Sequence, residues 1–400
     1  MGFIEFVLIV AAIMALNPAA MDLMLPALPD IAHSFGLANT NRTQLVLSVY
    51  MVGFGFAQFI VGPLSDRFGR RVTVLSGLSV YCLASVLATL APSFELLLVA
   101  RLLQGTGTAA ARVIATSIVR DCYNGRRMAS VISLAQMVFV TVPIIAPSLG
   151  QLLMMMRPDW QLLFFALLLF GLFVLVWCAV RLPETLSHHR RKSISFGDVL
   201  GNYRRIVSHR QTIGYTIAGG AVQGAILCYI FSAQQILSVH YELGRYFTLA
   251  FATVAFGFMT GGFLNSRFVE RLGMRLISHA GLVGLCIVSA LMLLGALLGY
   301  APLWLYMAVA IATTFGVGVT FANFTALAMI PHGDIAGTAS SLFGTLTILM
   351  GVVIGLIVGL SYDGTVMPMA IGIFLSAIGA LVTVLITERG RLFLAPKRPA

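Results

Sequence analysis

The sequence predicts an all-α polytopic membrane protein with twelve transmembrane helices, arranged as two pseudo-symmetric six-helix bundles. Apolar residues make up 59% of its 400 residues and charged residues only 10%, whereas soluble domains carry about 25% charged residues. The apolar residues form runs of about 18 or more, each long enough to cross about 30 Å of hydrocarbon. The expected spans are residues 5–32, 44–64, 72–91, 94–119, 129–152, 161–182, 211–237, 247–268, 274–298, 302–329, 337–361 and 365–387.

The longest polar stretch separates six spans from six. We therefore expect a bundle over 1–182, a cytoplasmic linker over 183–210, a second bundle over 211–388 and a cytoplasmic tail over 389–400. His188 and His189 in the linker could bind a metal or anionic lipid headgroups, but a solvated linker is the favoured interpretation.

Short internal matches indicate that the two bundles are repeats. Gly62, Leu64 and Arg67 recur 200 residues later, in a copy where Ser266 replaces the acid Asp66. The pair Gly105 and Gly107 recurs 211 residues later as Gly316 and Gly318. Two related halves are typical of transporters that rock around a binding site near the bilayer midplane.

The net charge of +11 follows membrane topology and does not indicate nucleic-acid binding. With a cytoplasmic N-terminus, the outer loops hold only Arg42, Arg157 and Arg245, while most other basic residues fall in inner loops and the tail. This positive-inside bias predicts that both termini are cytoplasmic.

Several other functions are disfavoured. Five scattered cysteines form no CxxC pair, so neither a disulfide framework nor a metal site is expected. The N-terminus lacks the basic flank and cleavage site of a signal peptide, so we expect the first span to stay in the protein. No phosphate-binding G-x-x-x-x-G-K-[ST] motif occurs, which argues against ATP hydrolysis.

Asp22 is the acidic residue that lies well inside a predicted span. It sits among Pro18, Pro26 and Pro29, which remove helix hydrogen bonds and loosen the backbone nearby. A carboxyl group at this depth costs roughly 2.5–3.5 kcal/mol, so such a residue is a candidate functional site. The alternative is an acid close enough to the surface to be hydrated; we favour the functional interpretation.

The fourth span carries two buried cations, Arg101 and Arg112, and each needs a partner or a water-filled cavity. Arg101 lies about as deep as Asp22, so a couple between them is geometrically possible. Arg112 could contact substrate, contact the inner gate, or extend toward the cytoplasmic interface. We therefore assign Asp22, Arg101 and Arg112 to proton coupling.

The segment GPLSDRFGRR, residues 62–71, ends the second span and turns into the third. Here the chain resembles the major facilitator superfamily, whose loop signature is G-x-L-a-D-r-x-G-r-[RK]. The resemblance implies a conformational latch, which lies mainly in the first half because the second copy lacks the acid. We expect Asp121 to extend it by pairing with Arg70. The predicted latch residues are Gly62, Leu64, Asp66, Arg67, Gly69, Arg70, Arg71 and Asp121.

Two further motifs resemble proton-coupled members of that superfamily. The fourth span matches R-x-x-Q-G-x-G, and the fifth contains VPIIAPSLG, a reduced form of the antiporter motif G-P-x-x-G-G in which Ala146 and Gln151 replace glycines. The prolines and glycine would kink and thin the helix where the halves meet. The predicted helix-packing residues are Gln104, Gly105, Gly107, Pro143, Pro147 and Gly150.

Taken together, these motifs resemble the bicyclomycin/chloramphenicol-resistance branch of drug–proton antiporters. The resemblance covers most of the first half; in the second it is mainly one of layout, with the GDIAGTASSL stretch at 333–342. It implies export of drug-like molecules in exchange for protons, from a bacterial inner membrane.

Drug-binding cavities are largely apolar and aromatic with few polar anchors. Each residue proposed for such a cavity here could instead pack helices together. The substrate-binding candidates are Met14, Asn17, Tyr50, Phe54, Gln58, Gln136, Phe139, Gln223, Tyr229 and Asn323.

We therefore expect a drug:proton antiporter that works by alternating access. It is not expected to be an enzyme, to need a cofactor beyond the proton gradient, or to need a second copy. The main alternative is a proton-coupled symporter or exporter of a sugar or other metabolite. An intramembrane enzyme would need a nucleophile–base or metal constellation, and the spans show none. A channel would need neither the repeat nor the latch.

Overall fold

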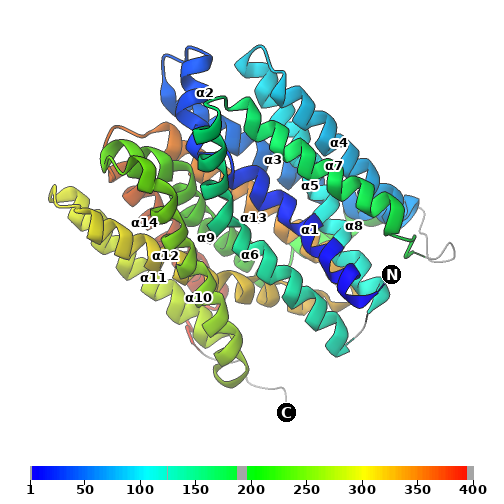
Figure 1. The fold of residues 1–400 in the computed structure, drawn as a ribbon. Helices are drawn as coiled ribbons and strands as arrows, with labels where there is room; N and C mark the ends of the chain where they lie inside the picture. The colour runs from blue at the N-terminus through cyan, green and yellow to red at the C-terminus, as the bar shows by residue number, and fades with distance from the viewer. Residues whose placement is uncertain (1, 124, 187–195, 394–400) are drawn as a thin grey trace. The chain divides into compact units, whose positions relative to one another are not determined.

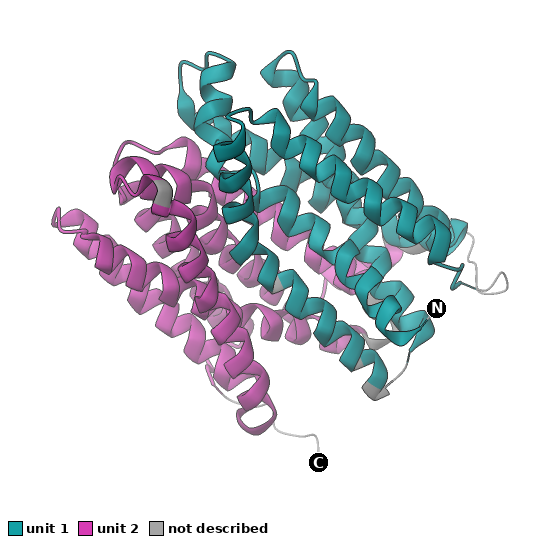
Figure 2. Cartoon of the chain, in the orientation of Figure 1, with its two compact units in different colours: residues 1–199 teal, residues 200–400 magenta. Residues whose placement is uncertain are grey.

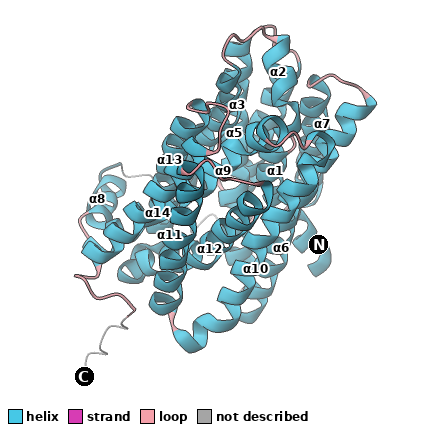
Figure 3. Cartoon of the chain, turned by 90° about the vertical axis from the view of Figure 1, so that its left-hand side faces the viewer, coloured by secondary structure: helices cyan, strands magenta, loops and turns pink. Residues whose placement is uncertain are grey.

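The computed structural model describes residues 2–123, 125–186 and 196–393, and in these residues every regular element is a helix (Figures 1 and 3). A backbone inside a bilayer must satisfy its own hydrogen bonds, which a helix does within one segment. The chain divides into two compact units, residues 1–199 and 200–400 (Figure 2). The boundary falls inside the predicted linker.

In the described residues up to 186, unit 1 contains six long helices and one short α-helix. They are α1 (Phe3–Asp22), α2 (Leu28–Ser34), α3 (Gln44–Phe68), α4 (Arg70–Thr89), α5 (Phe94–Cys122), α6 (Gly125–Met156) and α7 (Gln161–Arg181). Helix α5 packs against α3 and α4, α1 packs against α6, and α4 packs against α7.

Unit 2 repeats these pairings. It contains α9 (Arg210–Gln234), α10 (Phe247–Leu272), α11 (Met274–Leu297), α12 (Leu303–Met329), α13 (Ala336–Leu360) and α14 (Met367–Thr387). Helix α12 packs against α10 and α11, α9 against α13, and α11 against α14. A further helix, α8 (Phe196–Val207), lies within the predicted linker. His188 and His189 lie outside the described residues.

Eleven helices of the described part are long and apolar enough to cross a membrane. The remaining predicted span, 94–119, corresponds to the 29-residue helix α5. Its mean hydropathy is lower because it carries Arg101, Arg112, Gln104 and several glycines and threonines. The least apolar span is thus one of the most buried helices of unit 1.

Close helix contacts inside each unit show which positions of the two repeats correspond. A Cβ atom on Gly53 of α3 would clash with the carbonyl oxygen of Leu102 on α5, and one on Gly257 of α10 would clash with that of Ile311 on α12. Gly53 and Gly257 are 204 positions apart, and Leu102 and Ile311 are 209 apart. The repeat is therefore real, but its offset changes along the chain.

This register corrects the predicted match between the loops. The turns between α3 and α4 and between α10 and α11 each contain a glycine at positive φ, Gly69 at 99° and Gly273 at 83°. Aligning these glycines makes Glu270 the counterpart of Asp66, so the second copy of the loop motif also carries an acidic residue. The prediction that Ser266 replaces the acid was wrong because it assumed an offset of 200.

The predicted glycine match also shifts by two residues. A Cβ on Gly107 would clash with the Gly77 carbonyl of α4, and a Cβ on Gly316 would pack near the Gly281 carbonyl of α11. Gly107 therefore corresponds to Gly316, and Gly105 corresponds to Thr314, 209 positions later.

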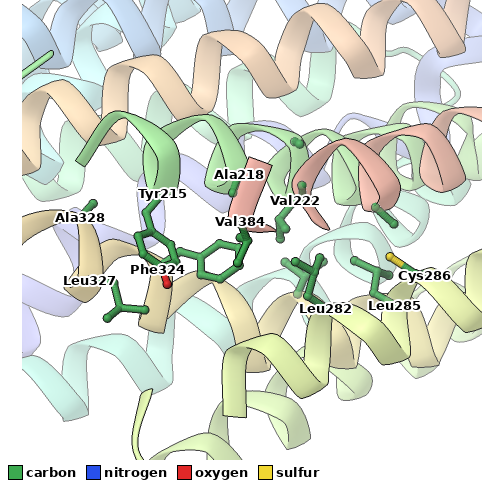
Figure 4. Close-up of a cluster of buried hydrophobic side chains, with 14 of the residues drawn as sticks. Tyr215, Ala218, Val222, Leu282, Leu285, Cys286, Phe324, Leu327, Ala328 and Val384 are labelled. Carbon is green, nitrogen blue, oxygen red and sulfur yellow. The ribbon is translucent and has the colours of Figure 1, made fainter. Parts of the chain in front are cut away.

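The core of unit 2 is a cluster of apolar side chains between α9, α11, α12 and α14 (Figure 4). Tyr215 and Val222 of α9, Leu282 and Leu285 of α11, and Phe324 of α12 are buried in it. At its edge the Tyr215 hydroxyl reaches polar partners, described below.

Candidate functional site

Asp22 lies where the first span breaks. Helix α1 ends at this residue, and a short 3₁₀ turn over Leu25–Ala27 follows before α2 begins. Proline at the second position of that turn and of α2 cannot continue a helical hydrogen-bond ladder. The predicted loosening of the backbone near the acid is therefore confirmed at Pro26 and Pro29, whereas Pro18 lies inside the continuous helix α1. The Asp22 residue is 5% exposed. Within the described residues its carboxyl group has no hydrogen bond and no ion pair.

Arg101 is fully buried and contacts the helix of Asp22 through the backbone. Its Nη1 donates to the carbonyl oxygen of Ala20 at 3.0 Å and its Nε to that of Val46 on α3 at 2.9 Å. Ala20 lies in the last turn of α1, where carbonyl groups lack helical partners. The structure therefore does not form the Asp22–Arg101 couple that the sequence allowed.

The ring of Tyr50 links Arg101 to a wider network. The Arg101 guanidinium lies 4.4 Å from the Tyr50 ring centroid, an arrangement that stabilises a desolvated cation. The Tyr50 hydroxyl lies 2.9 Å from Asn17 Oδ1 and 3.1 Å from Thr108 Oγ1. Because a hydroxyl donates a single hydrogen, these contacts compete. Asn17 and Tyr50, predicted to bind substrate, thus bind each other.

Gln104 extends the same network to α4. Its Oε1 accepts a hydrogen bond from Arg101 Nη1 at 2.6 Å, and its Nε2 donates to Ser85 Oγ at 2.8 Å. We call the side chains of Asn17, Tyr50, Ser85, Arg101, Gln104 and Thr108 the unit 1 polar network. It ties α1, α3, α4 and α5 together beside Asp22. Ser85 and Thr108 were not predicted, since isolated hydroxyls in a span carry no signal of a partner.

Arg112 lies about three turns along α5 from Arg101, and its guanidinium lies over two aromatic rings. Its guanidinium carbon lies 4.7 Å from the Phe139 ring centroid and 5.7 Å from that of Phe54. Phe54 is buried and Phe139 is half-buried. Both were predicted to line the substrate cavity, and in the structure both flank this cation. No acid in the described residues neutralises it.

The fifth predicted span forms α6, which continues as one helix through Pro143 and Pro147. A Cβ atom on Gly150 would clash with the carbonyl oxygen of Leu23, next to Asp22. The glycine was predicted to thin the helix where the halves meet. The close contact that the structure shows, with Leu23, lies within unit 1, where it lets α6 approach the break in the first span.

The predicted latch centres on Arg70, whose side chain is 5% exposed. Arg70 donates to Asp66 Oδ1 at 2.6 Å and to Asp121 Oδ2 at 3.0 Å, and it also bonds Ser65. The predicted Arg70–Asp121 pair is therefore confirmed. Arg71 reaches the carbonyl oxygen of Ala179 at 2.6 Å.

Other latch candidates lie outside this cluster. Arg67 is exposed and lies over the ring of Phe68, and Leu64 is half-buried. A Cβ atom on Gly62 would meet no described atom within 4 Å, so the close packing predicted for this glycine is absent from the described structure.

Glu184 is a member of the latch that the sequence analysis missed. Its carboxylate accepts the backbone N–H groups of Arg70 at 2.9 Å and Arg71 at 3.2 Å. These are the first residues of α4, whose preceding Gly69 offers no capping side chain. An acid at a helix N-terminus satisfies free N–H groups and interacts favourably with the helix dipole. An uncapped helix start was the available signal.

The other substrate candidates are scattered. Met14, Gln58 and Tyr229 are buried, Gln223 is half-buried and Gln136 is exposed. Tyr229 stacks on Phe251 with ring centroids 5.8 Å apart. Asn323 donates to Asn265 Oδ1 at 2.6 Å and packs α12 against α10. Stretch 333–342 begins the helix α13, and part of it lies outside the described side chains.

Comparison with known proteins identifies the family. Residues 10–356 match the sequence profile of the Major Facilitator Superfamily. The MFS-type transporter YdgK of Bacillus subtilis is 29% identical over 372 residues, covering 91% of this chain and 90% of that protein. Multidrug resistance protein MdtL of Shewanella oneidensis is 29% identical over 373 residues, covering 92% and 91%. A bicyclomycin resistance protein homolog of Haemophilus influenzae is 26% identical over 374 residues, covering 91% of each chain.

Solved structures show the same fold. The human organic anion transporter MFSD10 superposes with a TM-score of 0.70 at 18% identity, covering 97% of this chain and 100% of that one. A D-xylose-proton symporter superposes with a TM-score of 0.74 at 12% identity, covering 96% and 97%. The chain therefore belongs to the Major Facilitator Superfamily and is a multi-pass membrane transporter.

Proposed function

We propose that this transporter is a drug:proton antiporter that exports small amphipathic compounds such as antibiotics. The observation that carries the proposal is Asp22, a buried carboxyl group without a polar partner among the described residues, at the break of a membrane span. Such a group can gain and lose a proton without first breaking an ion pair. Relatives named for multidrug and bicyclomycin resistance, similar over more than 90% of the chain, support the substrate class.

In the proposed cycle, protons move inward while drug moves outward. Drug enters the inward-open carrier as Asp22 releases its proton to the cytoplasm. The carrier turns outward, Asp22 takes a proton from outside, and drug leaves before the protonated carrier returns. Binding free energy shifts the equilibrium only as far as drug and proton differ in affinity for the two states.

In this scheme the unit 1 polar network positions the acid. Arg101 holds the last turn of α1 through Ala20, two residues before Asp22, and Gly150 lets α6 pack on the residue after it. Arg112 remains the second cation of the site, available to substrate or to the inner gate. We further propose a bacterial inner-membrane location with cytoplasmic termini, a functional monomer, no cofactor beyond the proton gradient and no enzymatic activity.

The test uses inside-out membrane vesicles with an acidic lumen. We would add phenicols, bicyclomycin, sulfonamides and cationic dyes, and follow proton release in the wild type and in Asp22→Asn. Asp30→Asn is the matched control, because it makes the same chemical change at an exposed acid eight residues later. We expect drug-triggered proton efflux in the wild type and the control, and none in Asp22→Asn.

The other outcomes are equally informative. A response that survives Asp22→Asn would overturn its coupling role and turn attention to Asp66. A wild type that is stable in the vesicles yet silent across the panel would contradict drug antiport and favour transport of a metabolite.

A further inference from the structure

Unit 2 carries a polar cluster that belongs neither to the predicted site nor to the latch. It joins Tyr215 of α9, Arg275 and His279 of α11, Glu388 at the end of α14, and the backbone of Phe393. His279 is fully buried. Tyr215 also belongs to the apolar core of unit 2 (Figure 4), so the polar cluster adjoins that core.

The hydrogen bonds of the cluster have a defined direction. The N–H of Phe393 lies 3.0 Å from His279 Nδ1, and because a backbone N–H can only donate, Nδ1 carries no hydrogen. The neutral ring therefore has its hydrogen on Nε2, which lies 3.1 Å from the Tyr215 hydroxyl. That hydroxyl donates to Glu388 Oε1 at 2.7 Å, and Arg275 Nε donates to the same oxygen at 2.9 Å.

The segment that His279 holds is strained. Between Glu388 and Phe393, which we call the terminal strap, Arg389, Gly390 and Phe393 have φ values of 54°, 75° and 68°. Two of these are L residues in the left-handed region, a conformation that persists only when contacts enforce it.

Few contacts hold the end of the strap. Its first residues keep turn hydrogen bonds, as from Gly390 N to Leu385 O at 2.8 Å. The amide of Phe393 instead bonds His279, while Leu392 packs on the apolar core and the Phe393 ring meets the His279 ring edge-on at 6.1 Å. The end of the strap therefore depends on His279.

A second proton on His279 cannot be accommodated in this arrangement. The charged groups that act on the ring are Glu388 and Arg275, which already pair with each other at 2.9 Å. Among the described residues, α10 and α12 bring no charged side chain to it. A hydrogen on Nδ1 would face the N–H of Phe393, so donor would meet donor.

We propose that His279 is a second protonation site of the transporter, and that a proton on Nδ1 releases the terminal strap. Neutral His279 accepts the Phe393 amide and keeps the strap docked over the end of α11. The protonated ring loses that bond, the strained backbone relaxes, and the ring gains access to water. The site binds a proton alone, and its action does not depend on Asp22 or on drug.

Hydrogen–deuterium exchange of the full-length protein in detergent tests the proposal without any transport assay. Exchange of peptides covering residues 388–393 would be measured from pH 8 to pH 5 and corrected for the intrinsic pH dependence of amide exchange. We expect the wild type to lose protection at the end of the strap at least tenfold on acidification. Peptides from the middle of α11 should stay protected and show that the fold is intact.

Two substitutions separate the hydrogen bond from the proton. His279→Asn places an amide oxygen near the position of Nδ1, so the strap should stay protected at every pH. His279→Leu removes the acceptor and should leave the strap unprotected throughout. Equal pH dependence in the wild type and His279→Asn, or a wild-type strap that exchanges alike at pH 8 and pH 5, would overturn the proposal.

A third variant keeps the test decisive if the histidine variants fail to fold. Arg389 is exposed and lies at a φ of 54°, so Arg389→Gly relieves strain without touching the cluster. With less backbone strain in the docked strap, its release should require a lower pH. An unchanged pH midpoint for the loss of exchange protection would contradict the strained-strap mechanism.

Discussion

Units 1 and 2 share their helix contacts but fill their interiors with different chemistry. In unit 1, Arg101 and Tyr50 are fully buried and lie at the centre of the polar network. In the aligned repeats, Ala310 of unit 2 corresponds to Arg101, Val254 corresponds to Tyr50, and Ile226 corresponds to Asp22. Backbone packing is thus common to both repeats. Among the residues that the structure describes, buried charge near the middle of a span is found in the first repeat.

The difference shows that close packing and buried polarity are separable in this fold. Glycine contacts bring α3 and α5 together in unit 1 and α10 and α12 together in unit 2. The polar network is therefore not needed to build a bundle. A buried network costs desolvation, and replacing such groups with apolar ones is often neutral or stabilising. Its presence in one unit is consistent with a function there, namely the positioning of Asp22.

The largest effect should come from Arg101, the centre of the asymmetry. Arg101→Ala gives unit 1 the residue that unit 2 has at this position, but it leaves the Ala20 and Val46 carbonyl groups and the Gln104 amide without a donor. We expect a loss of about 3–5 kcal/mol in the free energy of unfolding, measured by thermal unfolding in detergent.

Two variants bracket this result. Arg101→Lys keeps the charge but not the planar fork, so most of the loss should remain. Arg157→Ala removes an exposed arginine that pairs only with Asp159 among the described residues, and should change stability by less than about 0.5 kcal/mol. A stable Arg101→Ala protein would show that the network is not structural.

Glycine substitutions test the half of the comparison that the units share. A Cβ on Gly105 would clash with backbone atoms of Tyr50 and Phe54, and a Cβ on Gly318 with those of Phe258 and Gly262. Alanine at either position should cost about 2–3 kcal/mol, because backbone cannot yield as a side chain can.

Gly62→Ala is the control for both, since its Cβ would meet no described atom. It should be neutral or slightly stabilising, by up to about 1 kcal/mol, through helix propensity. If Gly105→Ala changed the free energy of unfolding as little as Gly62→Ala, the close approach of α3 and α5 would be contradicted.

The fold was predictable from sequence to a far greater extent than the site. Long apolar runs located twelve helices, because a bilayer demands them. Two of the three prolines around Asp22, Pro26 and Pro29, lie where the first span breaks, whereas Pro18 lies inside α1. The partners of Arg101 were not predictable: they are backbone carbonyls, which every residue has, so no residue type announces them. The repeat offset was misjudged because Gly262 matches Gly62 locally, whereas the offset of 204 makes Ser266 the counterpart of Gly62.

The two glutamates after the last helix of each unit sharpen the comparison further. Glu184 and Glu388 are 204 positions apart, yet Glu184 caps the backbone of α4 while Glu388 binds the side chains of Arg275 and Tyr215. Glu388→Gln should lose about 2 kcal/mol, because its charge-assisted bond is largely buried. Glu184→Gln should lose about 1 kcal/mol, the value of an exposed cap. Equal losses would mean that the residues act alike, and the comparison of thermal midpoints decides it.

The smallest effects test the corrected register of the loops. Asp66 pairs with the buried Arg70, although its own side chain is 48% exposed, so Asp66→Asn should cost about 0.5–1 kcal/mol. Glu270 occupies the corresponding place in unit 2, but Met274 stands where Arg70 would be, and Glu270 is exposed. Glu270→Gln should therefore leave the thermal midpoint unchanged.

Introducing Met274→Arg restores the missing cation, and only a register that aligns Gly69 with Gly273 predicts that Glu270 then contributes to stability. A double-mutant cycle between positions 270 and 274 should give a coupling of about 0.5 kcal/mol. Zero coupling there, with coupling between Ser266→Asp and Glu270→Arg instead, would restore the alignment on Gly262, in which position 270 corresponds to Arg70.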